Sequence, residues 1–301
     1  MTHISEVADG IYQIETEEAT IPGSMGFPRS TLVFLIADVP AVLVEIGPAS
    51  AAQAVLNAIR RLGHDPSEVA RAVVTHVHLD HAGGAGTLAG QLPGVQILVH
   101  QRGAPHLVDP TRLIEATKQA FGERFEDDYG PILPVPEQRV DAVIEGETIP
   151  LQGRELKAIY APGHASHQMC IYDTKSRGIF SGEALGTPDT HAVSAVAGFD
   201  PDAALDTIDR LSKLDPLLVF CSHGGVVRDA SAHIQLVRAN MKAYGDIILK
   251  ALKAGAPREK IAGMLEAYQL RHSPAEYRAR IGQFDAIVTW HAAYFTKKGA
   301  V

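Results

Sequence analysis

Short apolar runs bounded by Gly, Pro or Asp recur along the chain up to about residue 231, and helical patterns separate several of them. Runs of this length that are rich in Val, Ile and Leu predict buried β-strands. Helices are expected over residues 51–62, from the glycines after His81, and over residues 202–214. Strands that alternate with helices in both halves predict an α/β fold whose sheets are covered by helices. The predicted strands are STLVFLI, AVLVEIG, RAVVTH, VQILVH, ELKAIYAP, MCIYD, RGIFSG and LLVFCSH.

The strand pattern stops near Ala232, where three helical stretches begin that are broken at GAPRE and HSPAE. The sequence therefore predicts an α/β domain over residues 1–231, which the motifs below make the candidate catalytic domain, and a helical C-terminal extension over residues 232–301. Within the first domain, residues 103–144 form a less regular insert with several prolines and one expected helix over residues 111–121.

Composition narrows the class of protein. Hydrophobic residues make up 46% and charged residues 21% of the chain, which predicts a folded protein. The net charge of -8, without a block of Lys or Arg, argues against nucleic acid as a partner. No apolar stretch approaches the ~20 residues of a membrane span, and the N-terminus does not resemble a signal peptide. A cytoplasmic protein with a small-molecule substrate is expected, with Cys170 and Cys221 as buried thiols rather than a disulfide, although their pairing stays open.

The densest chemical signal is THVHLDHAGG, in which a predicted strand runs directly into three histidines and an aspartate. Side chains two residues apart on an extended chain point the same way, so His76 and His78 can bind one ion while Asp80 and His81 reach a second position nearby. Imidazole nitrogens with a carboxylate suit zinc, iron or manganese. A polar surface loop is the alternative, but it does not explain this density of ligand types.

Three more candidate ligands follow strand-like runs. His164 lies in YAPGHASH, His223 in VFCSHGG and Glu183 in IFSGEALG. Loops at strand ends can direct a ligand without disturbing the sheet. A carboxylate between two dications can bridge them and offset their repulsion, which is the role expected of Glu183. An isolated histidine or a turn glutamate is more often a solvated residue. Here, however, the metal site predicted at His76 to His81 needs further ligands, which favours these three residues as ligands.

This order of motifs resembles the metallo-β-lactamase fold superfamily: an HxHxDH loop, a later histidine after Pro-Gly, an acidic residue after a strand and Gly, and a final histidine. The resemblance covers about residues 4–230. It implies a four-layer αβ/βα sandwich with a C-terminal helical appendage and a site at one edge between the sheets. It also implies that one metal is bound by His76, His78 and His164, and a second by Asp80, His81 and His223.

The sequence departs from the family pattern at two positions. Glu183 stands where the family usually has an aspartate as the bridging ligand, and Glu45 stands where many members have the Asp of an Asp-x-Gly motif. Because glutamate is one methylene longer, the bridge is expected to be monodentate, shifted or absent. Asp189 is near enough in sequence to be a substitute.

The predicted function is hydrolysis by a metal-bound hydroxide at a site with two divalent ions. Zinc is the favoured metal, and iron and manganese are the alternatives. Asp80 is the predicted catalytic residue, since it can also accept a hydrogen bond from the attacking water. The resemblance points to the branch of glyoxalase-type thioester hydrolases and lactonases, and the acidic charge argues against its nucleases.

Two loop-like segments, residues 15–30 and the insert of residues 103–144, contain aromatic and apolar residues that indicate the class of substrate. If both segments overhang the site, they form an apolar mouth, which favours an ester, lactone or thioester of a small apolar compound, while a phosphoester stays open. Ordinary packing of the insert against the core is the alternative. The predicted substrate contacts are Met25, Phe27, Phe121 and Phe125, with Tyr129 beside them.

Two other classes stay open. Related proteins with a single iron oxidise sulfur compounds, so a mononuclear iron sulfur dioxygenase is the first alternative. A non-catalytic metal-binding module is the second. The C-terminal helices are expected to cap the site or to form a homodimer.

Overall fold

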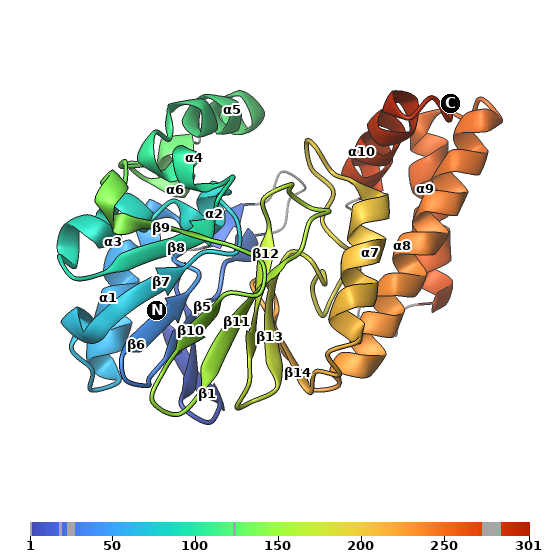
Figure 1. Cartoon of the computed structure of the whole chain (residues 1–301). Coiled ribbons are helices and arrows are strands. Elements are labelled where there is room, and N and C mark those ends of the chain that lie inside the picture. Colours follow the sequence, from blue (N-terminus) through green and yellow to red (C-terminus); the bar gives the residue numbers. More distant parts are fainter. Residues whose placement is uncertain (1, 18–19, 23–27, 123–124, 273–283) are drawn as a thin grey trace.

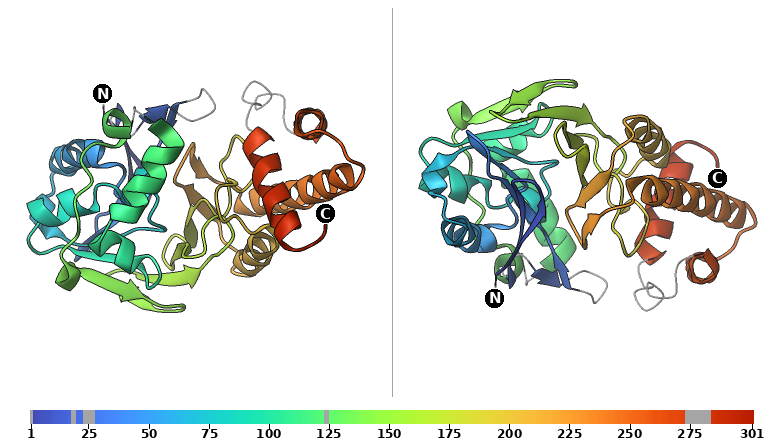
Figure 2. Two further views of the ribbon diagram at one scale, coloured as in Figure 1. Left: turned by 90° about the horizontal axis from the view of Figure 1, so that it is seen from above. Right: turned by 90° about the horizontal axis from the view of Figure 1, so that it is seen from below.

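Two mixed β-sheets form the centre of this computed structural model, which describes residues 2–17, 20–22, 28–122, 125–272 and 284–301. The sheets pack face to face, and helices cover the outer face of each (Figure 1). Views from above and below show the same four layers of helices, sheet, sheet and helices (Figure 2). The αβ/βα sandwich expected from the sequence is therefore confirmed.

The first sheet has seven strands in the order β1-β2-β5-β6-β7-β8-β9. Its first four strands pair antiparallel, and the pairs from β6 to β9 are parallel. Parallel neighbours need crossover connections, and all three of these contain helices. The helices are α1 (Ala52–Arg61) between β6 and β7, α2 (Leu79–Ala82) and α3 (Ala85–Gln91) between β7 and β8, and three helices of the insert between β8 and β9. The strands are β1 (His3–Ala8), β2 (Ile11–Glu15), β5 (Val33–Ile36), β6 (Ala41–Val44), β7 (Val69–Val73), β8 (Gln96–His100) and β9 (Val140–Val143).

The second sheet has six strands in sequence order, and only β13 and β14 pair in parallel. A separate hairpin joins β3 (Thr20–Pro22) to β4 (Pro28–Ser30). The strands of the second sheet are β10 (Thr148–Pro150), β11 (Glu155–Tyr160), β12 (Met169–Asp173), β13 (Gly178–Gly182), β14 (Leu218–Cys221) and β15 (Gly225–Val227).

The helices fall into two groups, one on each side of the sandwich (Figure 1). Apolar residues of α1 and α3 pack on the first sheet, and those of α7 and α8 pack on the second. No helix among the described residues is both long and apolar enough to cross a bilayer. The helices are α1 (Ala52–Arg61), α2 (Leu79–Ala82), α3 (Ala85–Gln91), α4 (Ala104–Val108), α5 (Thr111–Phe121), α6 (Phe125–Tyr129), α7 (Pro201–Ser212), α8 (Ala230–Lys253), α9 (Arg258–His272) and α10 (Phe284–Lys297).

The predicted C-terminal helices are present as α8, α9 and α10, which share an apolar core of their own. The first of them begins at Ala230, beside the predicted boundary, but α8 also packs on the second sheet. The division into a catalytic domain of residues 1–231 and a separate extension stays a prediction.

Buried aromatic rings fill the space between the two sheets. The ring of Phe34 in β5 meets Phe180 in β13 and Phe220 in β14 at centroid distances of 5.3 and 5.7 Å. All three side chains are almost fully buried. Burial of apolar area in this layer, at roughly 25 cal/mol per Å², is the main force that holds the sheets face to face.

Backbone hydrogen bonds connect the two sheets at one end. The amide of Met169 donates to the carbonyl of Thr75 at 2.9 Å, and the amide of Leu32 donates to the carbonyl of Ser222 at 2.8 Å. Thr75 and Ser222 each lie just beyond the end of a strand and just before a predicted metal ligand. The ends of β7 and β14 are thereby fixed relative to each other where the candidate site forms.

A buried ionic network connects the sheets at the opposite end. The guanidinium of Arg154 donates to Asp173 at 3.1 Å, to Asp38 at 3.3 Å and to the carbonyl of Asp9 at 2.6 Å. The side chains of Arg154 and Asp173 are 2% and 0% exposed. A buried carboxylate is tolerated only with its partners in place, so the network makes this end sensitive to the loss of Arg154.

We expect Arg154→Met to lower the free energy of unfolding by about 3 to 5 kcal/mol, because it leaves Asp173 buried without its cation. Urea unfolding of the purified variant measures the change. The matched control is Arg210→Met, which breaks a surface ion pair with Glu145 and should cost less than about 1 kcal/mol. Equal effects of the two substitutions would contradict the account of the network.

Candidate metal centre

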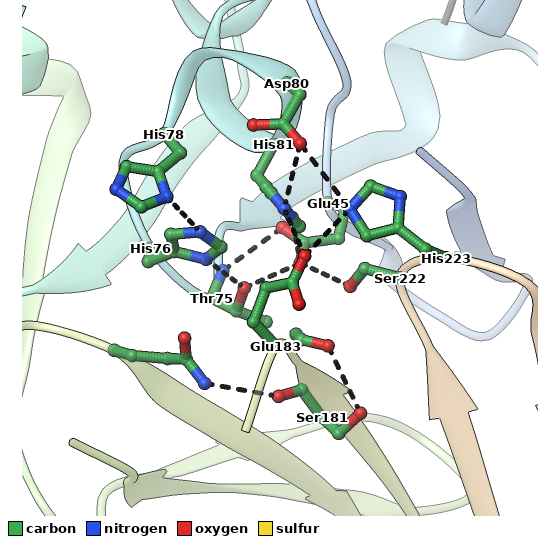
Figure 3. Close-up of polar contacts among 12 residues, drawn as sticks. Glu45, Thr75, His76, His78, Asp80, His81, Ser181, Glu183, Ser222 and His223 are labelled. Atoms are coloured by element: carbon green, nitrogen blue, oxygen red, sulfur yellow. Dashed lines mark hydrogen bonds and ion pairs between the residues drawn. The ribbon is translucent and has the colours of Figure 1, made fainter. Parts of the chain in front are cut away.

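The candidate site lies at the end of β7, where the strand continues into a short loop and then into α2. The loop places His76 and His78, and α2 adds Asp80 and His81 (Figure 3). The backbone of His81 is held because its carbonyl accepts hydrogen bonds from the amides of Ile46 and Gly47, both at 3.0 Å. The HxHxDH motif is thus fixed by the first sheet rather than by its own short helix.

Two groups of three predicted ligands form in this region, and the ligand atoms within each group lie within 4.8 Å of one another. We call His76, His78 and His164 the first trio, and Asp80, His81 and His223 the second trio. Both match the grouping that the resemblance implied. The structure therefore brings together all six residues, although their role as ligands stays a prediction.

Ring nitrogens of the first trio converge. Nδ1 of His78 lies 3.0 Å from Nε2 of His76 and 3.0 Å from Nε2 of His164. Burial, followed by the charges of neighbouring histidines, lowers the pKa of His76 well below its usual value. Burial, followed by the charge of His164, lowers the pKa of His78 to about 3. Burial lowers the pKa of His164 as well, so the three rings are neutral near pH 7.

Outer hydrogen bonds fix which ring nitrogen of His76 and His164 carries the proton. The hydroxyl of Thr75 donates to Glu45 at 2.6 Å, so it accepts from Nδ1 of His76 at 3.0 Å. Nδ1 of His164 donates to the carbonyl of Ser194 at 2.8 Å. Both Nε2 atoms then present lone pairs toward His78, which has one proton at most to share between them. Converging lone pairs of neutral imidazoles suit a divalent cation, so the residues fit the implied metal.

The second trio combines carboxylates with histidines. A carboxylate oxygen of Asp80 lies 3.3 Å from Nε2 of His81 and 3.5 Å from Nε2 of His223. An oxygen of Glu183 lies 3.1 Å from Nε2 of His223 and 4.0 Å from Nε2 of His81 (Figure 3). Glu183 thus lies beside the second trio, and its role as a bridging ligand stays a prediction.

Electrostatics differ between the trios because the second contains anions. Burial lowers the pKa of His81, but the charges of Asp80 and Glu45 outweigh it and raise the pKa well above its usual value. For His223, burial is outweighed by hydrogen bonds to Asp80 and Glu183, and the pKa rises to about 9. Burial raises the pKa of Asp80, but the two histidines outweigh it and hold the pKa well below its usual value. The second trio therefore stabilises positive charge, which is the charge of a metal ion.

Glu45 organises both trios, a role that the sequence did not predict. Its carboxylate accepts hydrogen bonds from the hydroxyl of Thr75, from Ser222 at 2.8 Å and from Nδ1 of His81 at 3.0 Å. It orients His81 directly and His76 through Thr75, so that both Nε2 atoms face the site. The backbone of Glu45 has φ of 63°, a left-handed conformation that costs about 1 kcal/mol or more in a residue other than glycine. The one feature of the sequence that could have indicated this role is the position of Glu45 as an acidic residue directly after a fully buried strand.

Asp189, the alternative ligand, and the predicted substrate contacts are not members of the two trios. Asp189 lies in the loop after Glu183. Phe125 is 4% exposed and packs within the insert against Tyr129 and, from α2, Leu79. This placement agrees with the packing alternative, and a substrate contact by Phe125 stays a prediction. Met25, Phe27 and the side chain of Phe121 lie outside the described part of the chain.

Comparisons with known proteins agree with the fold. The model of the metallo-beta-lactamase superfamily matches residues 26–223. An N-acyl homoserine lactonase of Bacillus thuringiensis is 27% identical over 231 residues, which covers 70% of this chain and 79% of the lactonase. An atrochrysone carboxyl ACP thioesterase of Aspergillus fumigatus is 22% identical over 215 residues, with 71% of this chain and 56% of the thioesterase covered.

A solved structure extends the likeness to the C-terminal helices. A metallo-beta-lactamase family protein from Thermus thermophilus has a TM-score of 0.68 and 21% identity, with 98% of this chain and 95% of that chain covered. The fold, the motif order and the match of the family model together establish that the chain belongs to the metallo-beta-lactamase superfamily.

Proposed function

We propose that the two trios and Glu183 hold two divalent metal ions, with zinc as the favoured metal. We also propose that the chain hydrolyses an ester, lactone or thioester of a small apolar compound. The observation that supports this most strongly is the pair of adjacent ligand groups, each with its ligand atoms within 4.8 Å of one another. Membership of a superfamily composed mostly of hydrolases supports a metal-dependent hydrolase in the same way.

Metal ions bound at these positions would bring the pKa of water close to neutral and would polarise the oxygen of the bond to be cleaved. Among the six residues of the trios, His78 and Asp80 are the partly exposed ones, and the other four are buried. Substrate therefore approaches from the side of His78 and Asp80. Since Asp80 stays ionised, its carboxylate can accept a hydrogen bond from the attacking water.

Acyl substrates are favoured over phosphoesters for two reasons. The N-acyl homoserine lactonase and the carboxyl ACP thioesterase that resemble this chain are named for the cleavage of bonds to an acyl carbon. Apolar side chains of the insert, Phe125 among them, pack with Leu79, which is the residue before Asp80. Phe125 and Leu79 are buried, so they support the proposal only by making the surroundings of Asp80 less polar, which suits an alkyl or aryl acyl group better than a charged phosphodiester.

The test is a substrate panel with metal-stripped protein that has been reconstituted with Zn²⁺, Mn²⁺ or Fe²⁺. A lactone, an ester, a thioester and a phosphodiester with similar apolar groups are compared by their kcat/KM. We expect the acyl substrates to be hydrolysed at least about 100-fold faster than the phosphodiester, a difference of roughly 2.7 kcal/mol in transition-state stabilisation. Preference for the phosphodiester would contradict the substrate class, and no turnover of any substrate would contradict the hydrolase.

A further inference from the structure

The loop of residues 184–199, between β13 and α7, connects the candidate metal centre to the C-terminal helices. It begins directly after Glu183, and within it the carbonyl of Ser194 accepts the hydrogen bond from Nδ1 of His164. The residue that follows the loop, Asp200, donates its amide to the carbonyl of Gly163 at 2.9 Å. The loop therefore contacts residues at or next to predicted ligands at both of its ends.

Three side chains of the C-terminal helices donate hydrogen bonds to carbonyls of this loop. His233 of α8 donates to Leu185 at 2.8 Å, and Asn240 of α8 donates to His191 at 2.9 Å. Gln269 of α9 donates to Thr190 at 3.3 Å. The exposed fractions of the three donors are only 4%, 1% and 6%. A buried polar side chain costs free energy unless it is hydrogen-bonded, so these three bonds contribute to holding the loop in place.

The loop depends on these helices for its shape. Gly186 and His191 both have left-handed backbone conformations, with φ of 61° and 46°. Such a backbone is unfavourable for His191 and persists where surrounding structure holds it. Ala192, the next residue, is buried in the apolar core of the C-terminal helices together with Tyr244 and Ile248. Packing and hydrogen bonds from α8 and α9 thus hold a turn whose backbone is unfavourable at His191.

We infer that the C-terminal helices position the metal ligands, with Asn240 and Gln269 as positioning residues that act through the loop of residues 184–199 on His164 and Glu183. The inference rests on the proposed metal centre. It assigns α8 and α9 a role different from capping the site or forming a dimer, because their buried donors contact the loop and are not members of either trio.

The test compares full-length Asn240→Leu with wild type. Leucine has a similar volume but cannot donate to the carbonyl of His191. The affinity of the metal-free protein for Zn²⁺ is measured by competition with a chromophoric chelator, and the visible spectrum of the Co²⁺-loaded protein reports the ligand geometry. We expect Asn240→Leu to bind Zn²⁺ about tenfold more weakly and to show an altered Co²⁺ spectrum.

The control for a general loss of stability is Ile59→Ala, a buried residue of α1 on the opposite side of the sandwich. Urea unfolding places the two variants on one stability scale. Wild-type Zn²⁺ affinity in Asn240→Leu, or an equal loss in Ile59→Ala at equal stability, overturns the inference. If Asn240→Leu does not fold, Gln269→Leu is judged by the same criteria. A wild-type protein that binds no Zn²⁺ contradicts the proposed function itself.

Discussion

Replacing His76 by alanine is expected to lower hydrolysis by about 1000-fold or more. His76 is fully buried, and its Nε2 faces His78 and the ligand position of the first trio. Loss of one ligand of three removes an ion that contributes several kcal/mol to the transition state, and about 4 kcal/mol corresponds to 1000-fold in rate. The measurement is kcat/KM for the best acyl substrate, with the metal content of the same sample.

The matched control for His76→Ala is His64→Ala. His64 is a histidine before the same strand, β7, and its ring lies 3.6 Å from Glu68 at the surface. Its removal should leave both the metal content and the rate within about twofold of wild type, since surface substitutions rarely change more than about 0.5 kcal/mol. A His76→Ala protein with full metal content and full activity would show that the first trio is not the reaction centre.

Glu45→Gln is expected to weaken metal binding at both trios by about 10- to 100-fold. The carboxylate accepts from Thr75, Ser222 and His81, whereas an amide presents two donors and one acceptor in the same space. His81 and His76 would then lose the hydrogen bonds that fix their tautomers. Zn²⁺ titration of the metal-free variant measures the affinity at each site.

Glu45→Asp provides the control for Glu45→Gln, because aspartate keeps the acceptor charge and faces the same left-handed backbone. We expect it to retain more affinity than Glu45→Gln despite its shorter side chain. If the two variants lose equal affinity, the site requires the length of the glutamate side chain as much as its acceptor charge. If neither loses affinity, Glu45 does not orient the ligands.

Buried strands were the most predictable part of the fold. The runs that form β5, β6 and β8 are apolar and almost completely buried, so their composition alone indicates a strand. By contrast, β1 has no fully buried residue, and β9 and β10 are short and largely exposed. Their sequences contain too few apolar positions to be distinguished from loops. These strands are defined by their pairing with neighbours rather than by their own pattern.

In the candidate site, the seven predicted metal-site residues lie together because their motifs follow the ends of strands that meet at one edge. The role of Glu45 was not predictable, since its partners Thr75 and Ser222 are 30 and 177 residues away in the sequence. The contact of Ser194 with His164 depends on a loop shaped by α8 and α9, and no local pattern encodes it. Longer-range packing decides these positions.

A homodimer, a cytoplasmic location and contacts of Met25, Phe27, Phe121 and Phe125 with substrate stay predictions. The cysteines are clearer: Cys170 and Cys221 are both buried and both free. A disulfide between them is therefore not part of this structure.

Elemental analysis of the purified, reconstituted wild-type protein tests the metal centre most directly. We predict close to two zinc, manganese or iron ions per chain, with hydrolysis that disappears on chelation and returns with the metal. One iron per chain without hydrolysis would instead favour the sulfur dioxygenase. No bound metal after careful reconstitution would contradict the central claim that the two trios are metal sites.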